Sequence, residues 1–207
     1  MSVVLLKQHG LRFGAPGASA VHLCVDMQRM FAEGSRWAMP WMSRVLPQVV
    51  TLADAQPERL CFTRFIPLRH AAEGRGTWRR YYERWPDMTR DELAGEMLDL
   101  VPPLDRYAPP APVIDKHVYG PWQTTPLADQ LAAAGKDTLI ISGGETEVCV
   151  LATVLGAIDL GFRVIIAVDA LCSSSDQTHD AIMAVYHNRF GSQVETSTVA
   201  ELVDCWC

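Results

Sequence analysis

The chain has 207 residues, of which 49% are hydrophobic and 20% are charged, and its 18 Lys and Arg residues against 24 Asp and Glu residues give a formal net charge of −6. This composition excludes intrinsic disorder and low-complexity or collagen-like chains. The net acidity argues against a nucleic-acid partner.

Short apolar runs alternate with longer helical patterns along the chain. Strands are expected at 20–27, 59–65, 112–117, 137–142, 163–170 and 193–196, and helices at 40–55, 146–160 and 176–189. Nearly continuous apolar strands separated by helices are typical of a parallel sheet that is covered on both faces. We therefore predict an α/β fold, a doubly wound three-layer α/β/α sandwich with a mostly parallel six-stranded sheet.

One segment interrupts this alternation. Residues 66–111 are rich in arginine and aromatic residues, with GRGTWRRYYERW at 74–85 and the proline-rich YAPPAP at 107–112. Because no repeat or linker divides the chain, we predict a single domain, 1–207, with an insertion at about 66–111 that carries one or two short helices. Its arginines could bind an anionic substrate, form an oligomer interface or cover a solvated helix face.

We expect no signal for export or membrane insertion in this sequence. No apolar run approaches the ~18 residues of a membrane helix, and the N-terminal MSVVLLKQHGLRFG lacks the basic start and cleavage site of a signal peptide. We therefore expect a cytoplasmic protein with no membrane partner, in which the six cysteines are reduced thiols.

Three polar residues stand at the ends of predicted strands, where open parallel sheets bind ligands: Asp26, Lys116 and Cys149. Cys149 falls in the first turn of a predicted helix, whose positive end lowers the pKa of a thiol and whose N–H groups can bind an oxyanion. Taken singly, each of these residues has an ordinary structural explanation. Core packing would explain Cys149, the capping of a turn would explain Asp26, and a surface ion pair would explain Lys116. Together they supply a base, a cation and a nucleophile.

The sequence resembles the isochorismatase-like cysteine hydrolases, a superfamily that includes nicotinamidases, N-carbamoylsarcosine amidase and isochorismatase. The matching segments are VDMQRMF (25–31), DKHVYGPW (115–122), SGGETEVCV (142–150) and VDALCSSS…H (168–179). The resemblance implies that Asp26, Lys116 and Cys149 are a catalytic triad. It also implies a cis peptide bond between Gly144 and Glu145, which would direct the backbone N–H groups of Glu145 and Cys149 into an oxyanion hole, and a homo-oligomer, dimer or tetramer.

The chain departs from parts of this pattern. Nicotinamidases bind a metal through an Asp-x-His motif and a further His, whereas the corresponding TRFIPLRH (63–70) offers only His70, so we expect no metal. No Gly-rich phosphate loop follows a strand, so we expect no organic cofactor. Family members often have Ser and Phe at Gly120 and Trp122, which alters the pocket wall. Isochorismatases proper lack the nucleophilic cysteine, and Cys149 therefore favours C–N bond hydrolysis.

We predict a cysteine-dependent hydrolase that cleaves an amide or ureido C–N bond of a small-molecule substrate through a thioester intermediate. Phe31, Trp37, Tyr119 and Trp122 flank the triad segments and are expected to line the substrate pocket, with core or interface packing as the alternative. Two other functions stay open. One is vinyl-ether hydrolysis with Asp26 as the acid, and the other is a non-catalytic binding or assembly role.

Overall fold

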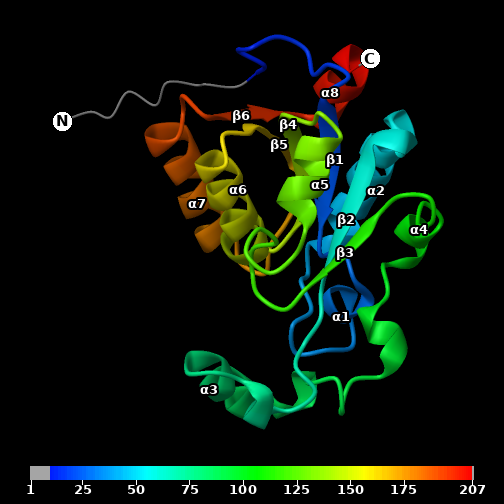
Figure 1. Ribbon diagram of the computed structural model, residues 1–207, viewed down its shortest axis with the longest axis vertical. Coiled ribbons are helices and arrows are strands. Elements are labelled where there is room, and N and C mark those ends of the chain that lie inside the picture. Colours follow the sequence, from blue (N-terminus) through cyan, green and yellow to red (C-terminus); the bar gives the residue numbers. More distant parts are fainter. Residues whose placement is uncertain (1–9, 207) are drawn as a thin grey trace.

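A six-stranded sheet in the order β3-β2-β1-β4-β5-β6 forms the centre of the computed structural model, which describes residues 10–206 (Figure 1). The strands are β1 (Ala20–Val25), β2 (Leu60–Phe65), β3 (Val113–Lys116), β4 (Thr138–Gly144), β5 (Arg163–Cys172) and β6 (Val194–Ser197). All five pairings between them are parallel. The predicted doubly wound α/β fold is thus confirmed. Residues 1–9, which hold most of the stretch considered as a signal peptide, and Cys207 lie outside the described residues.

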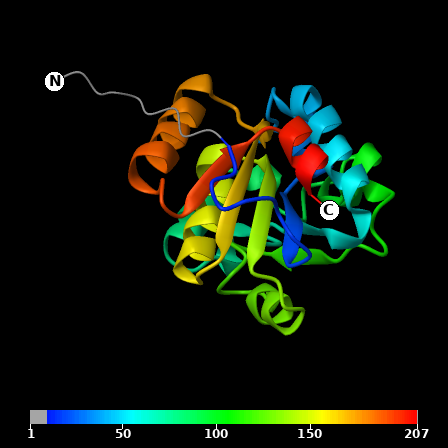
Figure 2. The same ribbon diagram turned by 90° about the horizontal axis from the view of Figure 1, so that it is seen from above.

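Helices cover both faces of the sheet (Figures 1 and 2). The α-helices are α1 (Arg29–Ala32), α2 (Met42–Ala55), α3 (Thr77–Arg84), α4 (Pro102–Asp105), α5 (Leu127–Ala133), α6 (Leu151–Asp159), α7 (Asp176–Arg189) and α8 (Val199–Cys205). Short 3₁₀ turns occupy Pro57–Arg59, Ala71–Glu73, Pro86–Met88 and Gly95–Leu98.

Two separate apolar cores result from this layering. On one face, Val49 of α2 and Leu202 of α8 belong to the same buried cluster. On the other face, Leu131 of α5, Val154 of α6 and Tyr186 of α7 belong to a second cluster. Strands β1 and β4 are buried along their whole length because both of their faces are covered. None of the helices in the described range is long and apolar enough to cross a membrane.

The structure adds local detail that the apolar pattern did not predict. The expected helix at 146–160 opens as a π-helical turn, Thr146–Val150, and becomes α-helical only in α6. Helix α8 was missed, although Thr198 and Glu201 form a capping box at its start. Helix α5 was missed because its pattern is short.

The arginine-rich segment, 66–111, contains α3, α4 and three of the 3₁₀ turns. Figure 1 places α3 beyond the ends of the strands, apart from the layers that cover the sheet. Its aromatic side chains point back toward the sheet: the ring of Trp78 lies 5.0 Å from that of Tyr119 and 6.4 Å from that of Phe65. The segment therefore closes over the end of the sheet at which the candidate catalytic residues were expected.

Candidate active site

Asp26 and Lys116 form a buried ion pair beyond the carboxyl ends of β1 and β3. The Nζ atom of Lys116 lies 2.6 Å from Oδ2 of Asp26, and the two side chains are 0% and 1% exposed. Strand β2 lies between β1 and β3, and its Thr63 donates a hydrogen bond of 2.6 Å to Oδ1 of Asp26. The long side chain of Lys116 thus reaches across one strand to the carboxylate.

Cys149 approaches this pair from β4, the other neighbour of β1. The chain leaves β4 through Gly143, where φ is +98° and a Cβ atom would lie 2.1 Å from the carbonyl oxygen of Val25, so only glycine fits against β1. The peptide bond between Gly144 and Glu145 is cis, as the resemblance implied. The π-helical turn that follows carries Cys149, which is 6% exposed.

The three predicted residues share one electrostatic environment. Burial raises the pKa of the Cys149 thiol, the Lys116 ammonium opposes this effect and the Asp26 carboxylate adds to it. Burial alone would lower the pKa of Lys116, but the negative charge of Asp26, together with Cys149, raises it. The expected lowering of the thiol pKa by the helix end is therefore wrong, because desolvation outweighs it. The thiol thus lies beside an ammonium–carboxylate pair whose two charges shift its pKa in opposite directions.

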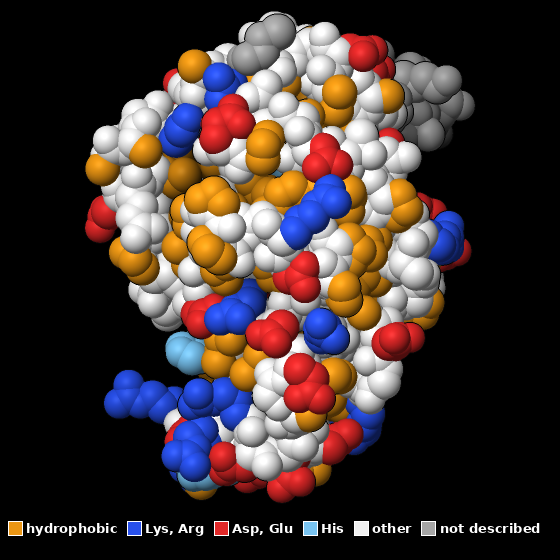
Figure 3. All heavy atoms as spheres, turned by 90° about the vertical axis from the view of Figure 1, so that its right-hand side faces the viewer, with side chains coloured by type: hydrophobic (Ala, Val, Ile, Leu, Met, Phe, Trp, Pro, Cys, Tyr) orange, Lys and Arg blue, Asp and Glu red, His pale blue; other side chains and the backbone are white. Residues whose placement is uncertain are grey.

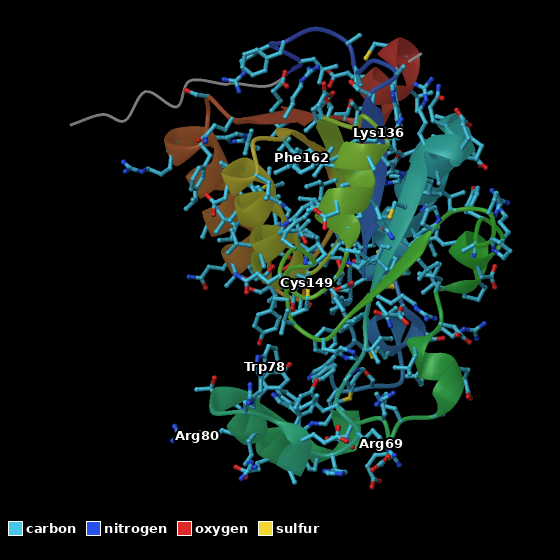
Figure 4. The ribbon with its side chains drawn as sticks, in the orientation of Figure 1. Arg69, Trp78, Arg80, Lys136, Cys149 and Phe162 are labelled. Carbon is cyan, nitrogen blue, oxygen red and sulfur yellow. The ribbon has the colours of Figure 1, made fainter. Side chains whose placement is uncertain are left out.

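A cavity of about 320 Å³ opens at Cys149. Six of its thirteen lining residues are aromatic, and a few polar side chains lie between them. Its lining consists of Phe31, Arg36, Trp37, Ala38, Phe65, Tyr81, Trp85, Tyr119, Gly144, Glu145, Val148, Cys149 and Ser174. In Figure 4, Trp78 projects from α3 toward the end of the sheet where Cys149 lies.

The structure places three of the four predicted pocket residues in this lining: Phe31, Trp37 and Tyr119. Trp122 is not among them. Its ring stacks on Phe162 with centroids 5.7 Å apart, and its indole N–H donates to the carbonyl oxygen of Thr153 at 2.8 Å. The indole thus packs against α6, which agrees with the alternative of core packing that was given for Trp122.

Several lining residues were missed by the sequence analysis: Arg36, Phe65, Tyr81, Trp85 and Ser174. Phe65 ends β2, as Lys116 ends β3, so the rule that pointed to the triad could also have found it. In WRRYYERW (78–85) the aromatic residues recur at helical spacing and so share one face of the helix, with the arginines on the other. Tyr81 and Trp85 belong to that aromatic face.

Hydrogen bonds to the segment after β5 fix the turn that carries Cys149. The Glu145 carboxylate accepts from the backbone N–H of Ser174 at 3.0 Å and from the Ser174 hydroxyl. The Thr146 hydroxyl donates to the carbonyl oxygen of Cys172 at 3.1 Å and lies 3.0 Å from Nδ1 of His179. These contacts join the SGGETEVCV segment to the VDALCSSS…H segment.

His70, the one histidine in the segment that corresponds to the nicotinamidase metal motif, lies outside the cavity lining. His70 is exposed, its Nε2 atom lies 3.9 Å from Glu73, and it does not line the cavity. Over residues 10–206, no group of three or more His, Cys, Asp or Glu side chains is placed to hold a metal ion.

The chain is similar to known proteins in both sequence and fold. Residues 20–198 match the model of the isochorismatase domain. The chain is 31% identical over 90 residues to the uncharacterized isochorismatase family protein YwoC of Bacillus subtilis, covering 44% of this chain and 48% of that protein. It is 26% identical over 125 residues to a maleamate amidohydrolase of Pseudomonas putida, covering 60% of this chain and 56% of that protein. The chain thus spans about half the length of the curated relatives it matches.

Solved structures share the fold. A cysteine hydrolase from Pseudomonas syringae pv. phaseolicola superposes with a TM-score of 0.75 at 19% identity, covering 90% of this chain and 91% of that one. N-carbamoylsarcosine amidase from Thermoplasma acidophilum superposes with a TM-score of 0.71 at 17% identity, covering 87% of this chain and 96% of that one.

Proposed function

The chain belongs to the isochorismatase family of hydrolases, and we propose that it cleaves the C–N bond of a small amide or ureido compound with Cys149 as the nucleophile. The observation that carries the proposal is the position of Cys149. Its thiol lines a cavity of substrate size and feels the charges of a buried carboxylate and a buried ammonium group. That set of groups fits nucleophilic acyl transfer.

The raised pKa of the thiol defines the first step. Burial favours the protonated thiol, and in the proposed step its proton passes to the Asp26 carboxylate as the sulfur attacks the substrate carbonyl and the S–C bond forms. Lys116 stabilises the negative charge that moves from Asp26 to the sulfur and then to the carbonyl oxygen. The backbone N–H groups of Glu145 and Cys149 are the proposed donors to that oxyanion.

The same carboxylate completes the cycle. The tetrahedral intermediate collapses, the C–N bond breaks, and protonated Asp26 gives its proton to the leaving nitrogen, which departs as ammonia or an amine. Water then attacks the thioester and loses a proton to Asp26. The S–C bond breaks, the acid product leaves, and the proton returns from Asp26 to the Cys149 sulfur.

The test is ammonia release from a panel of small amides and ureido compounds, with the wild type compared with Cys149→Ala. Cys61→Ala is the matched control, because Cys61 is also buried and its pKa is raised by burial to about 12, yet it does not line the cavity. We expect release by the wild type and the control only. Hydroxylamine should trap the thioester as a hydroxamate.

Two results would contradict this mechanism. Ammonia release that persists in a folded Cys149→Ala protein would exclude the thiol as the nucleophile. Pyruvate release from a vinyl ether, with no dependence on Cys149, would instead establish acid catalysis by Asp26.

A further inference from the structure

We propose that Arg36 binds a carboxylate group of the substrate, so that the substrates are amides or ureido compounds that carry a second, anionic end on a flat acyl group. This inference deepens the proposed function and relies on it for the bond that is cleaved. Arg36 lines the cavity together with Cys149, and it is the one Arg or Lys in the lining formed by the described residues.

The guanidinium of Arg36 is held in place but not saturated. It lies 4.4 Å from the centroid of the Trp85 ring, and its Nη1 atom donates to Oδ1 of Asp87 at 3.1 Å. The side chains of Arg36 and Asp87 are 53% and 48% exposed, so this ion pair is worth little. A guanidinium has five N–H donors in a planar fork that matches a carboxylate, and a ligand can therefore use those that Asp87 does not.

Asp87 apart, the charged groups nearest Cys149 do not oppose an anion. The Asp26 carboxylate and the Lys116 ammonium compensate each other at 2.6 Å behind the lining. The carboxylate of Glu145 is turned toward the segment after β5, where it accepts hydrogen bonds from the backbone and the hydroxyl of Ser174. Arg36 is thus the charged side chain of the lining with donors available for a ligand.

Helix α3, beside the cavity, carries three Arg residues and one Glu residue. Arg79, Arg80 and Arg84 of α3 are exposed, and Figure 3 shows Lys and Arg side chains, with Asp and Glu side chains beside them, at the end of the molecule where Figure 1 places α3. In Figure 4, Arg80 projects away from the body of the protein.

The aromatic wall indicates the shape of the rest of the substrate. The ring of Trp37 has the rings of Phe31, Phe65 and Tyr81 within 6.2 Å, 6.0 Å and 5.7 Å of its centroid. Flat, rigid rings of this kind bind planar groups by stacking and edge contacts. A small conjugated or aromatic acyl group with a carboxylate suits both the wall and Arg36.

The experiment compares probes that differ only in a carboxylate: 3-carbamoylbenzoate with benzamide, and succinamate with propionamide. Binding to the Cys149→Ala protein is followed by tryptophan fluorescence, because Trp37 and Trp85 line the cavity. We expect the carboxylate member of each pair to bind at least about tenfold more tightly, because the other member cannot form the charged hydrogen bond to Arg36. Of the four probes, 3-carbamoylbenzoate should bind most tightly, because it also has a flat ring. The wild-type kcat/KM for ammonia release should follow the same order.

Variants assign the preference to one residue. Arg36→Gln should abolish it, and Arg36→Lys should keep only part of it, because an ammonium group is a point charge rather than a fork. Arg84→Gln is the matched control: its guanidinium lies 5.7 Å from the same Trp85 ring but does not line the cavity. In that variant the preference should stay.

Failure of this inference is distinguishable from failure of the proposed function. Equal binding of both members of each pair, no binding of either carboxylate probe, or a preference that survives Arg36→Gln would overturn the role of Arg36, whatever the ammonia assay shows. An Arg36-dependent preference without ammonia release from any amide would uphold the carboxylate site and contradict the hydrolase.

Discussion

The hydroxyl group of Thr63 donates a hydrogen bond of 2.6 Å to Oδ1 of Asp26, on the opposite oxygen from the one that Lys116 binds. Both carboxylate oxygens therefore have a partner before any substrate arrives. A general base that is fixed in this way keeps one orientation toward the thiol, and such supporting contacts determine how precisely a catalytic group is placed.

Thr63→Val tests this support, because valine has nearly the same shape and suits a buried strand but cannot donate. We expect kcat for an amide substrate to fall about tenfold through the loss of one hydrogen bond to a charged group. KM should stay unchanged, since Thr63 does not line the cavity. Thr63→Ser retains the hydroxyl and should keep most of the activity. Wild-type kcat in Thr63→Val would contradict the role of the hydrogen bond.

The buried pair of Asp26 and Lys116 should show strong coupling in stability. Lys116→Met leaves a carboxylate uncompensated in the interior, and Asp26→Asn leaves an ammonium group, so each change should cost about 3–5 kcal/mol of unfolding free energy. The double variant buries no charge and should lose much less than the two single losses added together. Urea unfolding of all four proteins measures the difference. Additive losses would show that the pair does not interact in the folded state.

The convergence of Asp26, Lys116 and Cys149 was predictable because the carboxyl ends of parallel strands meet at one edge of a sheet. The order of the strands was not, since nothing in the apolar pattern places β2 between β1 and β3. Thr63 was missed for that reason: in the sequence it is one more β-branched residue in an apolar strand, and it gains its role only when Lys116 reaches across it.

Burial and side-chain direction also escaped the sequence analysis. Cys149 lies in the first turn of a helical segment, as predicted. The direction in which its pKa is shifted, however, depends on how much of the thiol the surrounding structure covers. The segment 66–111 was identified from its composition, whereas the direction of its aromatic face required the position of α3. Trp122 lies six positions after Lys116 in the sequence and yet packs against α6, outside the cavity lining.

His22 should make the protein sensitive to acid. It is fully buried in β1, its Nε2 atom lies 2.7 Å from the hydroxyl of Ser142, and burial lowers its pKa to about 3. Below the ordinary value of 6.5 the unfolded chain takes up a proton at His22 and the folded chain does not, so the unfolding free energy falls by about 1.4 kcal/mol per pH unit.

The measurement is urea unfolding of the wild type and of His22→Gln between pH 7 and pH 5, a range chosen to lie above most carboxylate titrations. Glutamine can keep a hydrogen bond to Ser142 and does not titrate. The wild type should lose about 2 kcal/mol more than the variant over this range. Parallel pH profiles would show that His22 is not kept neutral by folding.

At alkaline pH the buried thiols should also make the free energy of unfolding depend on pH, but here it should fall as the pH rises. Burial raises the pKa of Cys24 and Cys61 to about 12, and it also raises the pKa values of Cys149 and Cys172 above their ordinary value of 9.0. Above that value the unfolded chain releases protons that the folded chain retains. Stability is therefore fully present below about pH 9 and declines above it, by about 1.4 kcal/mol per pH unit for each thiol.

Urea unfolding under reducing conditions between pH 8 and pH 10 measures how the free energy of unfolding falls with pH. In Cys61→Ala this slope should be shallower by the contribution of one thiol. An equal slope in that variant would mean that the Cys61 thiol ionises as readily in the folded protein as in the unfolded chain.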